Sequence, residues 1–168
     1  MRHWILLAAG AVAAGVAGCE QAAAPNPVTA APAEAAAAPS DLAAYEGTSF
    51  AEFISAAGAN YAPQSLNISD ASRARLARAM GVSAPAFNIE GGGAEALVFV
   101  GCAETDCAAA AGIVAVDRAT GAPFAAVRDA AGQAILVANP RLEALIEATS
   151  PANRWADPEA WANDPPEP

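Results

Sequence analysis

The 168-residue sequence predicts an α+β domain, in which an antiparallel β-sheet meander of about five strands is flanked by short helices and carries one disulfide. Three observations predict this class. Apolar residues recur at helical spacing before residue 80 and again after residue 140. Between these segments, short apolar runs alternate with tight-turn signals. Two cysteines enclose one of those turns.

The N-terminus has the anatomy of a secretory signal. Arg2 supplies a short positive segment, and an apolar stretch that is too short to span a bilayer follows it. The stretch ends in Val16–Cys19, which resembles the cleavage box of bacterial lipoproteins, where small residues precede a lipidated cysteine. We therefore expect residues 1–18 to be removed and Cys19 to carry acyl chains such as palmitate. Glu20 follows in place of the aspartate associated with inner-membrane retention, which favours a periplasm-facing anchor in the outer membrane.

Residues 19–40 predict a flexible linker. They are rich in alanine and proline and have no apolar periodicity, so they cannot bury a core. The globular domain is expected over residues 41–149. An acidic, proline-rich tail follows at residues 150–168, and its Trp155 and Trp161 are expected to pack on the domain or to be loosely disordered rather than to dock a partner.

Two helices are expected before the strands. The first covers residues 50–57 and ends at Gly58. The second covers residues 71–80 and is capped by Ser69 or Asp70. Its cationic side chains are expected to form a solvated face rather than a basic binding patch: Arg73, Arg75 and Arg78.

The period changes after Pro85, where five runs have the composition of strands. They are residues 86–90, 95–102, 112–118, 122–129 and 133–139. Their continuous apolar character indicates that both faces of the sheet are partly covered, a role that we assign to the two N-terminal helices. After Pro140, residues 141–148 return to helical spacing.

The residue inventory argues against several kinds of chemistry. The single histidine, His3, leaves with the signal, which excludes histidine-based triads and histidine-ligated zinc. Cys102 and Cys107 lack a third thiol or imidazole, and their spacing is not that of a thioredoxin-like redox pair. Glu104 and Asp106 lie on a loop that we expect to be exposed, where solvation gives neither carboxyl group the special environment that acid–base catalysis needs. We therefore expect no enzyme activity, no catalytic residues, no metal and no cofactor.

The charge of the chain points to cationic partners. The net charge is −10 at pH 7, and there is no lysine. Such a chain repels nucleic acid and anionic membrane surfaces, so we expect no nucleic-acid binding and membrane contact through the lipid anchor alone. A homodimer is left open.

Cys102 and Cys107 remain as an even pair once Cys19 carries lipid. In an oxidising compartment, such a pair is expected to form a disulfide. The closed loop would lose less ordering entropy on binding than an open one, which suits a recognition element. A simple structural staple on a hairpin explains the same residues equally well.

A strand that enters Cys-x4-Cys, followed by an apolar strand, a turn and another strand, resembles the Ivy family, the periplasmic inhibitors of vertebrate-type lysozyme. The resemblance covers roughly residues 49–139, including Phe50 and Phe53 in the preceding helical segment. It implies an antiparallel sheet flanked by helices, and a protein partner such as a c-type lysozyme that is bound through the loop formed by Ala103, Glu104, Thr105 and Asp106.

The family's loop reads Cys-Lys-Pro-His-Asp-Cys, and its histidine enters the lysozyme cleft. Both cysteines and Asp106 match this motif, whereas Ala103, Glu104 and Thr105 replace lysine, proline and histidine. Contact with the catalytic carboxylates of a lysozyme must therefore differ from the family's, and Glu104 brings a like charge towards them. The alternative to a lysozyme-binding lipoprotein is a structural or interaction lipoprotein of the envelope without lysozyme inhibition.

Overall fold

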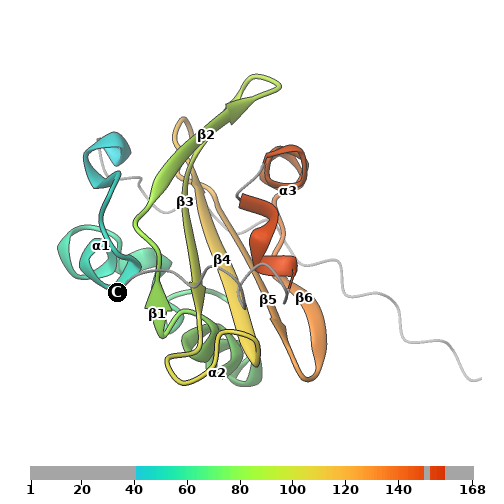
Figure 1. Ribbon diagram of the computed structural model, residues 1–168. Coiled ribbons are helices and arrows are strands. Elements are labelled where there is room, and N and C mark those ends of the chain that lie inside the picture. The colour runs from blue at the N-terminus through green and yellow to red at the C-terminus, as the bar shows by residue number, and fades with distance from the viewer. Residues whose placement is uncertain (1–40, 150–151, 158–168) are drawn as a thin grey trace, which may run out of the picture.

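The computed structural model describes residues 41–149 and 152–157 (Figure 1). Their helices and strands are η1 Leu42–Tyr45, α1 Phe50–Ala56, η2 Ala59–Tyr61, α2 Asp70–Ala79, β1 Val82–Ser83, β2 Phe87–Gly91, β3 Ala94–Cys102, β4 Ala110–Asp117, β5 Pro123–Asp129, β6 Gly132–Val137, α3 Pro140–Ala148 and η3 Ala152–Ala156. The predicted signal, the lipidated Cys19, the linker to residue 40 and Trp161 lie outside the described residues.

The strands form one antiparallel sheet of six strands in the order β1-β3-β4-β5-β6, and β2 pairs with β3 beside β1. The predicted α+β class with an antiparallel meander is confirmed. The five predicted strands correspond to β2 to β6. The sixth, β1, is two residues long and pairs Val82 with Cys102, which is too short for any periodicity to reveal.

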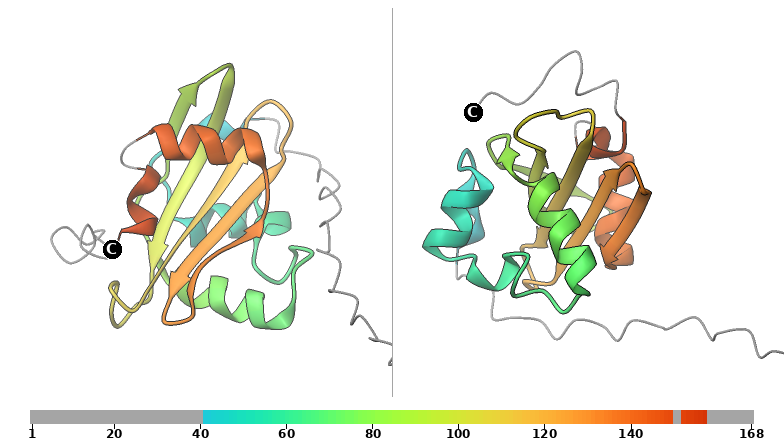
Figure 2. Two further views of the ribbon diagram at one scale, coloured as in Figure 1. Left: turned by 90° about the vertical axis from the view of Figure 1, so that its right-hand side faces the viewer. Right: turned by 90° about the horizontal axis from the view of Figure 1, so that it is seen from below.

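Both faces of the sheet are covered, but not by the two N-terminal helices alone, and that part of the expectation was wrong. Figures 1 and 2 show α1 and α3 on opposite sides of the sheet. The first core lies under α1 and α2 and includes Phe50, Phe53, Leu76, Phe99, Val114 and Val127. The second lies under α3 and η3 and includes Val98, Ile113, Phe124, Leu142, Ile146 and Trp155. Because each central strand faces two cores, its sequence is apolar at consecutive positions.

The aromatic centre of the first core is Phe53. Its ring centroid lies 4.8 Å from that of Phe99 and 5.6 Å from that of Tyr61. Burial raises the pKa of Tyr61, and its hydroxyl donates to the carbonyl oxygen of Gly121 at 3.0 Å. A Cβ atom at Gly58 would lie 2.4 Å from the Phe53 ring, so the glycine predicted as a helix stop also makes room for this ring.

The three α-helices begin at side-chain caps. Ser49 and Glu52 form a capping box at α1, and the hydrogen bond from the Ser49 amide lowers the pKa of Glu52. Ser69 caps α2, which decides between the two predicted caps. Asn139 caps α3, whose first residue is Pro140.

Two paired glycines let α2 approach the sheet. Gly101 of β3 is opposite Gly112 of β4. A Cβ atom at Gly101 would lie 2.7 Å from the carbonyl oxygen of Val82, and one at Gly112 would lie 3.0 Å from the Cβ of Ala79 in α2. The C-terminal end of α2 therefore packs directly against the backbone of β3 and β4, next to the end of β3 that carries the disulfide.

The second core reaches into the segment predicted as the tail. Ala152 is fully buried and Trp155 is 8% exposed, and both pack with residues of α3 and the sheet. The structure thus places Trp155 on the domain, beyond the predicted boundary at residue 149.

Candidate partner-binding loop

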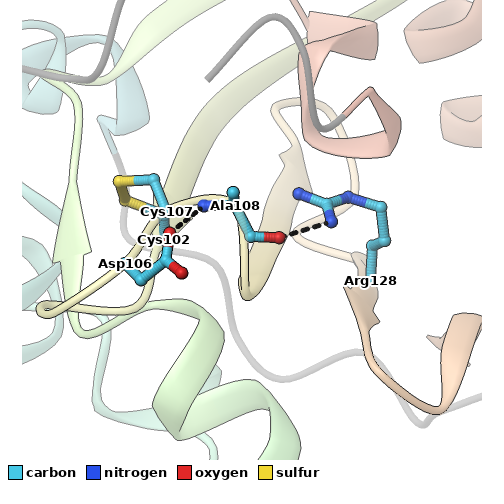
Figure 3. Close-up of a disulfide and its surroundings, with 5 residues drawn as sticks. All are labelled: Cys102, Asp106, Cys107, Ala108 and Arg128. Atoms are coloured by element: carbon cyan, nitrogen blue, oxygen red, sulfur yellow. Dashed lines mark hydrogen bonds between the residues drawn. A yellow bond between two sulfur atoms is a disulfide. The ribbon is translucent and has the colours of Figure 1, made fainter. Parts of the chain in front are cut away.

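The Cys-x4-Cys loop joins the two central strands of the sheet. Cys102 is the last residue of β3, and it forms the predicted disulfide with Cys107 (Figure 3). Strand pairing continues up to the loop, since Cys102 is opposite Ala111. The disulfide therefore closes a short loop on a fully paired hairpin.

The exposed part of the loop is its acidic tip. Glu104, Thr105 and Asp106 are exposed, whereas Cys102 is buried. Ala103, which was assigned to the same binding loop, is 7% exposed, and its amide donates to the carbonyl oxygen of Ala110 at 3.0 Å. Ala103 extends the hairpin, and the next three side chains are the ones that a partner can reach.

Asp106 organises the return of the loop to β4. Its carboxylate accepts a hydrogen bond from the amide of Ala108 at 2.9 Å, and its carbonyl accepts one from the amide of Ala109 at 3.1 Å (Figure 3). An aspartate that bonds the backbone two residues on is a common way to fix a turn. The aspartate shared with the family loop therefore has a structural task in this chain.

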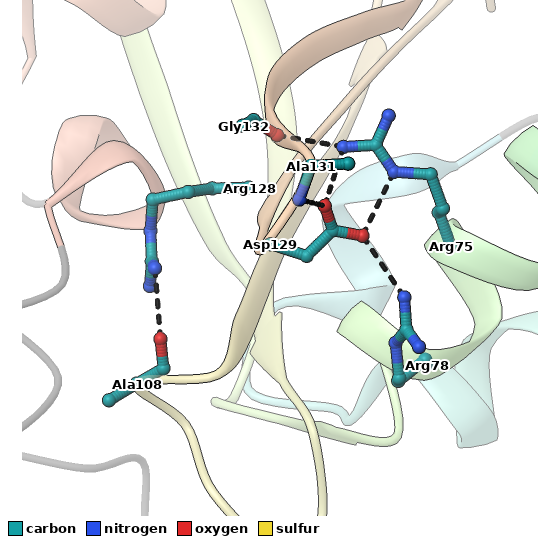
Figure 4. Close-up of polar contacts among 7 residues, drawn as sticks. All are labelled: Arg75, Arg78, Ala108, Arg128, Asp129, Ala131 and Gly132. Atoms are coloured by element: carbon teal, nitrogen blue, oxygen red, sulfur yellow. Dashed lines mark hydrogen bonds and ion pairs between the residues drawn. The ribbon is translucent and has the colours of Figure 1, made fainter.

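Arg128 of β5 links the loop to η3. Its Nη1 donates to the carbonyl oxygen of Ala108 at 3.0 Å (Figures 3 and 4). Its Nε lies 3.4 Å from the carbonyl oxygen of Trp155. One guanidinium thus contacts both the disulfide loop and η3. Nothing in the local sequence marks Arg128, because its partners lie 20 and 27 positions away.

Glu104 lies over the end of α2. A Cβ atom at Gly81 would be 3.0 Å from the Cγ of Glu104 and 3.4 Å from its amide nitrogen. Gly81 was predicted only as a helix stop. In the structure, it also leaves room for the first acidic side chain of the tip.

A partly buried ion cluster lies at the same end of the sheet as the loop. Ala110, which follows the loop, pairs with Asp129 at the end of β5. Arg75 donates to the Asp129 carboxylate through Nε at 2.9 Å and Nη2 at 2.8 Å, and Arg78 donates at 3.0 Å (Figure 4). Hydrogen bonding from Arg75 holds the pKa of Asp129 below its usual value, although burial opposes this effect.

The arginines of α2 therefore do not form a uniformly solvated face. The Arg75 side chain is 23% exposed and paired, whereas Arg73 bonds Asp70 on the surface of the same helix. In residues 41–149 and 152–157, no group of three or more histidine, cysteine, aspartate or glutamate side chains is placed to hold a metal ion. No helix in these ranges is both long and apolar enough to cross a bilayer.

The fold and the loop define the class of protein: a small α+β domain whose central hairpin carries a disulfide-closed, acidic tip. The family model described as inhibitor of vertebrate lysozyme (Ivy) matches residues 66–164, which is more than half of the chain. The chain belongs to the Ivy family. No curated protein and no solved structure matches it.

The family match begins at Leu66 and continues past η3. It lies further along the chain than the resemblance over residues 49–139, and it includes α2, all six strands and α3. Proteins of this family are inhibitors of lysozyme and not enzymes. Membership therefore implies that the partner of the chain is a protein, lysozyme.

Proposed function

We propose that this Ivy-family chain is an envelope lipoprotein, anchored through Cys19 in the outer membrane and facing the periplasm, that binds a lysozyme-type muramidase through Glu104, Thr105 and Asp106. One observation carries the proposal. The three side chains are exposed at the tip of a loop that is closed by a disulfide and hydrogen-bonded on both sides, and the two residues before the tip, Cys102 and Ala103, are buried.

The closed loop supports binding through preorganisation. Flexible loops lose conformational entropy when a partner orders them, at a cost of roughly 1–2 kcal/mol per residue. The disulfide, the Asp106 turn and Arg128 restrict this loop before any partner arrives. More of the contact energy then remains available for affinity.

Charge supports a basic partner. The chain carries a net charge of −10, and two carboxylates stand at the tip. Lysozymes of this kind are typically basic, so long-range attraction would speed the encounter. Inside the cleft, however, Glu104 would approach catalytic carboxylates, and Thr105 offers a neutral hydroxyl where the family has an imidazole. The expected complex is therefore weaker than that of the family's usual loop, or is formed with a muramidase whose cleft differs.

A turbidity assay tests the proposal directly. The chain from Glu20 to Pro168 is added to several lysozyme types that are clearing a bacterial cell-wall suspension. We expect slower clearing with at least one lysozyme and stronger inhibition by Thr105→His. Thr120→His is the matched control, because Thr120 is exposed in the β4–β5 turn at the opposite end of the strands. Thr120→His should inhibit clearing to the same extent as the wild-type chain.

The alternative is an envelope lipoprotein without lysozyme inhibition, and the absence of an imidazole from the loop favours it. It predicts no inhibition by the wild-type chain at micromolar concentration and none by Thr105→His. That result would remove lysozyme as the partner and leave the scaffold without its proposed target.

The anchor has its own test. The full chain, expressed with labelled palmitate, should incorporate the label and fractionate with outer membranes, whereas Cys19→Ser should lose both properties. Recovery of wild-type label-free protein from the soluble periplasmic fraction would contradict the lipoprotein assignment and leave the loop proposal standing.

A further inference from the structure

The last strand of the sheet, β6, has an edge that pairs with no other strand of the described residues. It ends the strand order β1-β3-β4-β5-β6, and its sequence contains neither a charged residue nor a proline. Such residues commonly protect edge strands against pairing with other chains. Ile135 on this strand is 46% exposed, and it is the only exposed large apolar side chain among the described residues. The pairing of β6 with β5 shifts register between Ala126 and Ala125, so the regular part of the edge is residues 132–135, and this part is able to accept another strand.

A groove of about 420 Å³ runs beside this edge, between β6, α3 and η3. Its lining includes four large apolar side chains from these elements and from β5: Phe124, Ile135, Ile146 and Trp155. Gln133 of β6 donates to the carbonyl oxygen of Ala156 at 3.1 Å, which holds η3 against the start of the strand. The groove is thus built from three elements that are fixed to one another.

Two carboxylates also line the groove. Glu143 and Glu147 are one turn apart on α3, so they lie on the same face of that helix. Neither forms an ion pair with another side chain in the described part of the protein. An apolar groove bordered by two carboxylates that have no ion-pair partner among the described side chains favours a ligand that is both apolar and cationic.

We propose that β6 and this groove bind an extended basic segment of a partner protein. The segment adds a strand to β6, as peptides do in other sheet-edge complexes. Side chains of a strand alternate between its two faces, so an apolar side chain packs near Ile135 and Trp155 while a neighbouring lysine or arginine on the same face reaches Glu143 or Glu147. The net charge of −10 opposes a second copy of the chain at this edge. The site is independent of the lysozyme proposal, because it shares no residue with the loop.

The probe is a labelled peptide that repeats Val-Ser-Lys-Ser, so that valine and lysine alternate on one face of the strand, and its comparator has glutamate in place of lysine. Fluorescence anisotropy is measured with the chain from Glu20 to Pro168, which contains the whole described fold. We expect the lysine peptide to bind and the glutamate peptide not to bind. Added salt should weaken the lysine complex. In a Trp161→Phe background, the peptide should change the emission of Trp155.

Paired variants separate specific from general charge effects. Glu143→Gln with Glu147→Gln should raise the Kd of the lysine peptide about three- to tenfold. The control, Glu46→Gln with Glu90→Gln, removes the same charge from exposed positions elsewhere and should stay within about twofold. Ile135→Asn should weaken binding by about fivefold or more, since it removes apolar contact. Circular dichroism verifies that each variant folds.

Hydrogen exchange locates the peptide. Amides of β6 should be protected when the lysine peptide is added, while those of β2, on the opposite edge, should not change. Equal binding of both peptides, equal effects of the two double variants, or protection of β2 instead of β6 would overturn the proposal. So would a dimer in sedimentation that Ile135→Asn abolishes, because the occupant would then be a second copy. Binding that appears only after removal of residues 158–168 would assign the groove to the chain's own tail.

Discussion

Replacing Asp129 by asparagine tests how much the partly buried ion cluster beside the loop contributes to stability. The carboxylate side chain is 6% exposed and accepts hydrogen bonds from Arg75, Arg78 and the amide of Ala131. A hydrogen bond to a charged group contributes about 1.5–3 kcal/mol, and an exposed ion pair less than about 1 kcal/mol. Asparagine keeps one acceptor but loses the charge, so we expect Asp129→Asn to cost about 2 kcal/mol.

The matched control is Asp70→Asn. Asp70 also pairs with an arginine of α2, but its side chain is 97% exposed. An exposed pair of this kind contributes about 0.3–0.5 kcal/mol. For a domain of this size, 1 kcal/mol corresponds to roughly 4 °C in Tm. Thermal unfolding followed by circular dichroism at neutral pH should therefore give losses of about 8 °C for Asp129→Asn and about 2 °C for Asp70→Asn.

The pH dependence gives a second measurement of the same cluster. The pKa of Asp129 is lower in the folded chain than in the unfolded chain, so the folded state binds fewer protons at this site. The stabilisation is full above the unfolded pKa of about 3.9 and is lost as pH falls through the folded pKa. The Tm difference between wild type and Asp129→Asn should shrink below about pH 4. Equal losses in the two variants, or a difference that persists in acid, would refute the reasoning.

Three further substitutions test the loop and the first core. Arg128→Ala should speed hydrogen exchange of the loop amides near Ala108, while Arg128→Lys should restore part of the protection; unchanged exchange in both would show that the guanidinium does not hold the loop. Gly58→Ala should destabilise the domain by about 1–3 kcal/mol in urea titrations, because its Cβ would overlap the Phe53 ring; a neutral result would mean that the ring moves freely. Tyr61→Phe should cost about 1 kcal/mol in the same titrations, since a buried carbonyl loses its donor; a gain in stability would contradict this.

The strands and helices could be predicted because their signals are local. Apolar runs, turn residues and caps lie within a few positions of one another, and five strands and three α-helices follow from them. The coverage of the sheet could not be assigned in this way. A strand that is apolar at consecutive positions reveals that both faces are buried, but it does not reveal which helix lies on which face. The folding of α3 and η3 onto the second face is decided by long-range packing.

The site was predictable in part for the same reason. Cys102 and Cys107 are close in sequence, and the exposure of the tip follows from their position between two strands. The contacts of Arg128 with the loop, and of Arg75 with Asp129, join residues that are 20 and 54 positions apart. No spacing rule connects such pairs. Ala103 appeared equivalent to its neighbours in sequence, and only strand pairing shows that it is buried.

The paired glycines beneath the loop have a consequence for how the family can diversify. Gly101 and Gly112 lie where any side chain would meet backbone or α2, so selection for folding restricts both positions. Glu104, Thr105 and Asp106 project from this base with exposed side chains, and of the three, Asp106 fixes the turn. Positions 104 and 105 are therefore free to change at little cost in stability. A lineage could replace an imidazole there, and so acquire a new target, while the base beneath the tip remained unchanged.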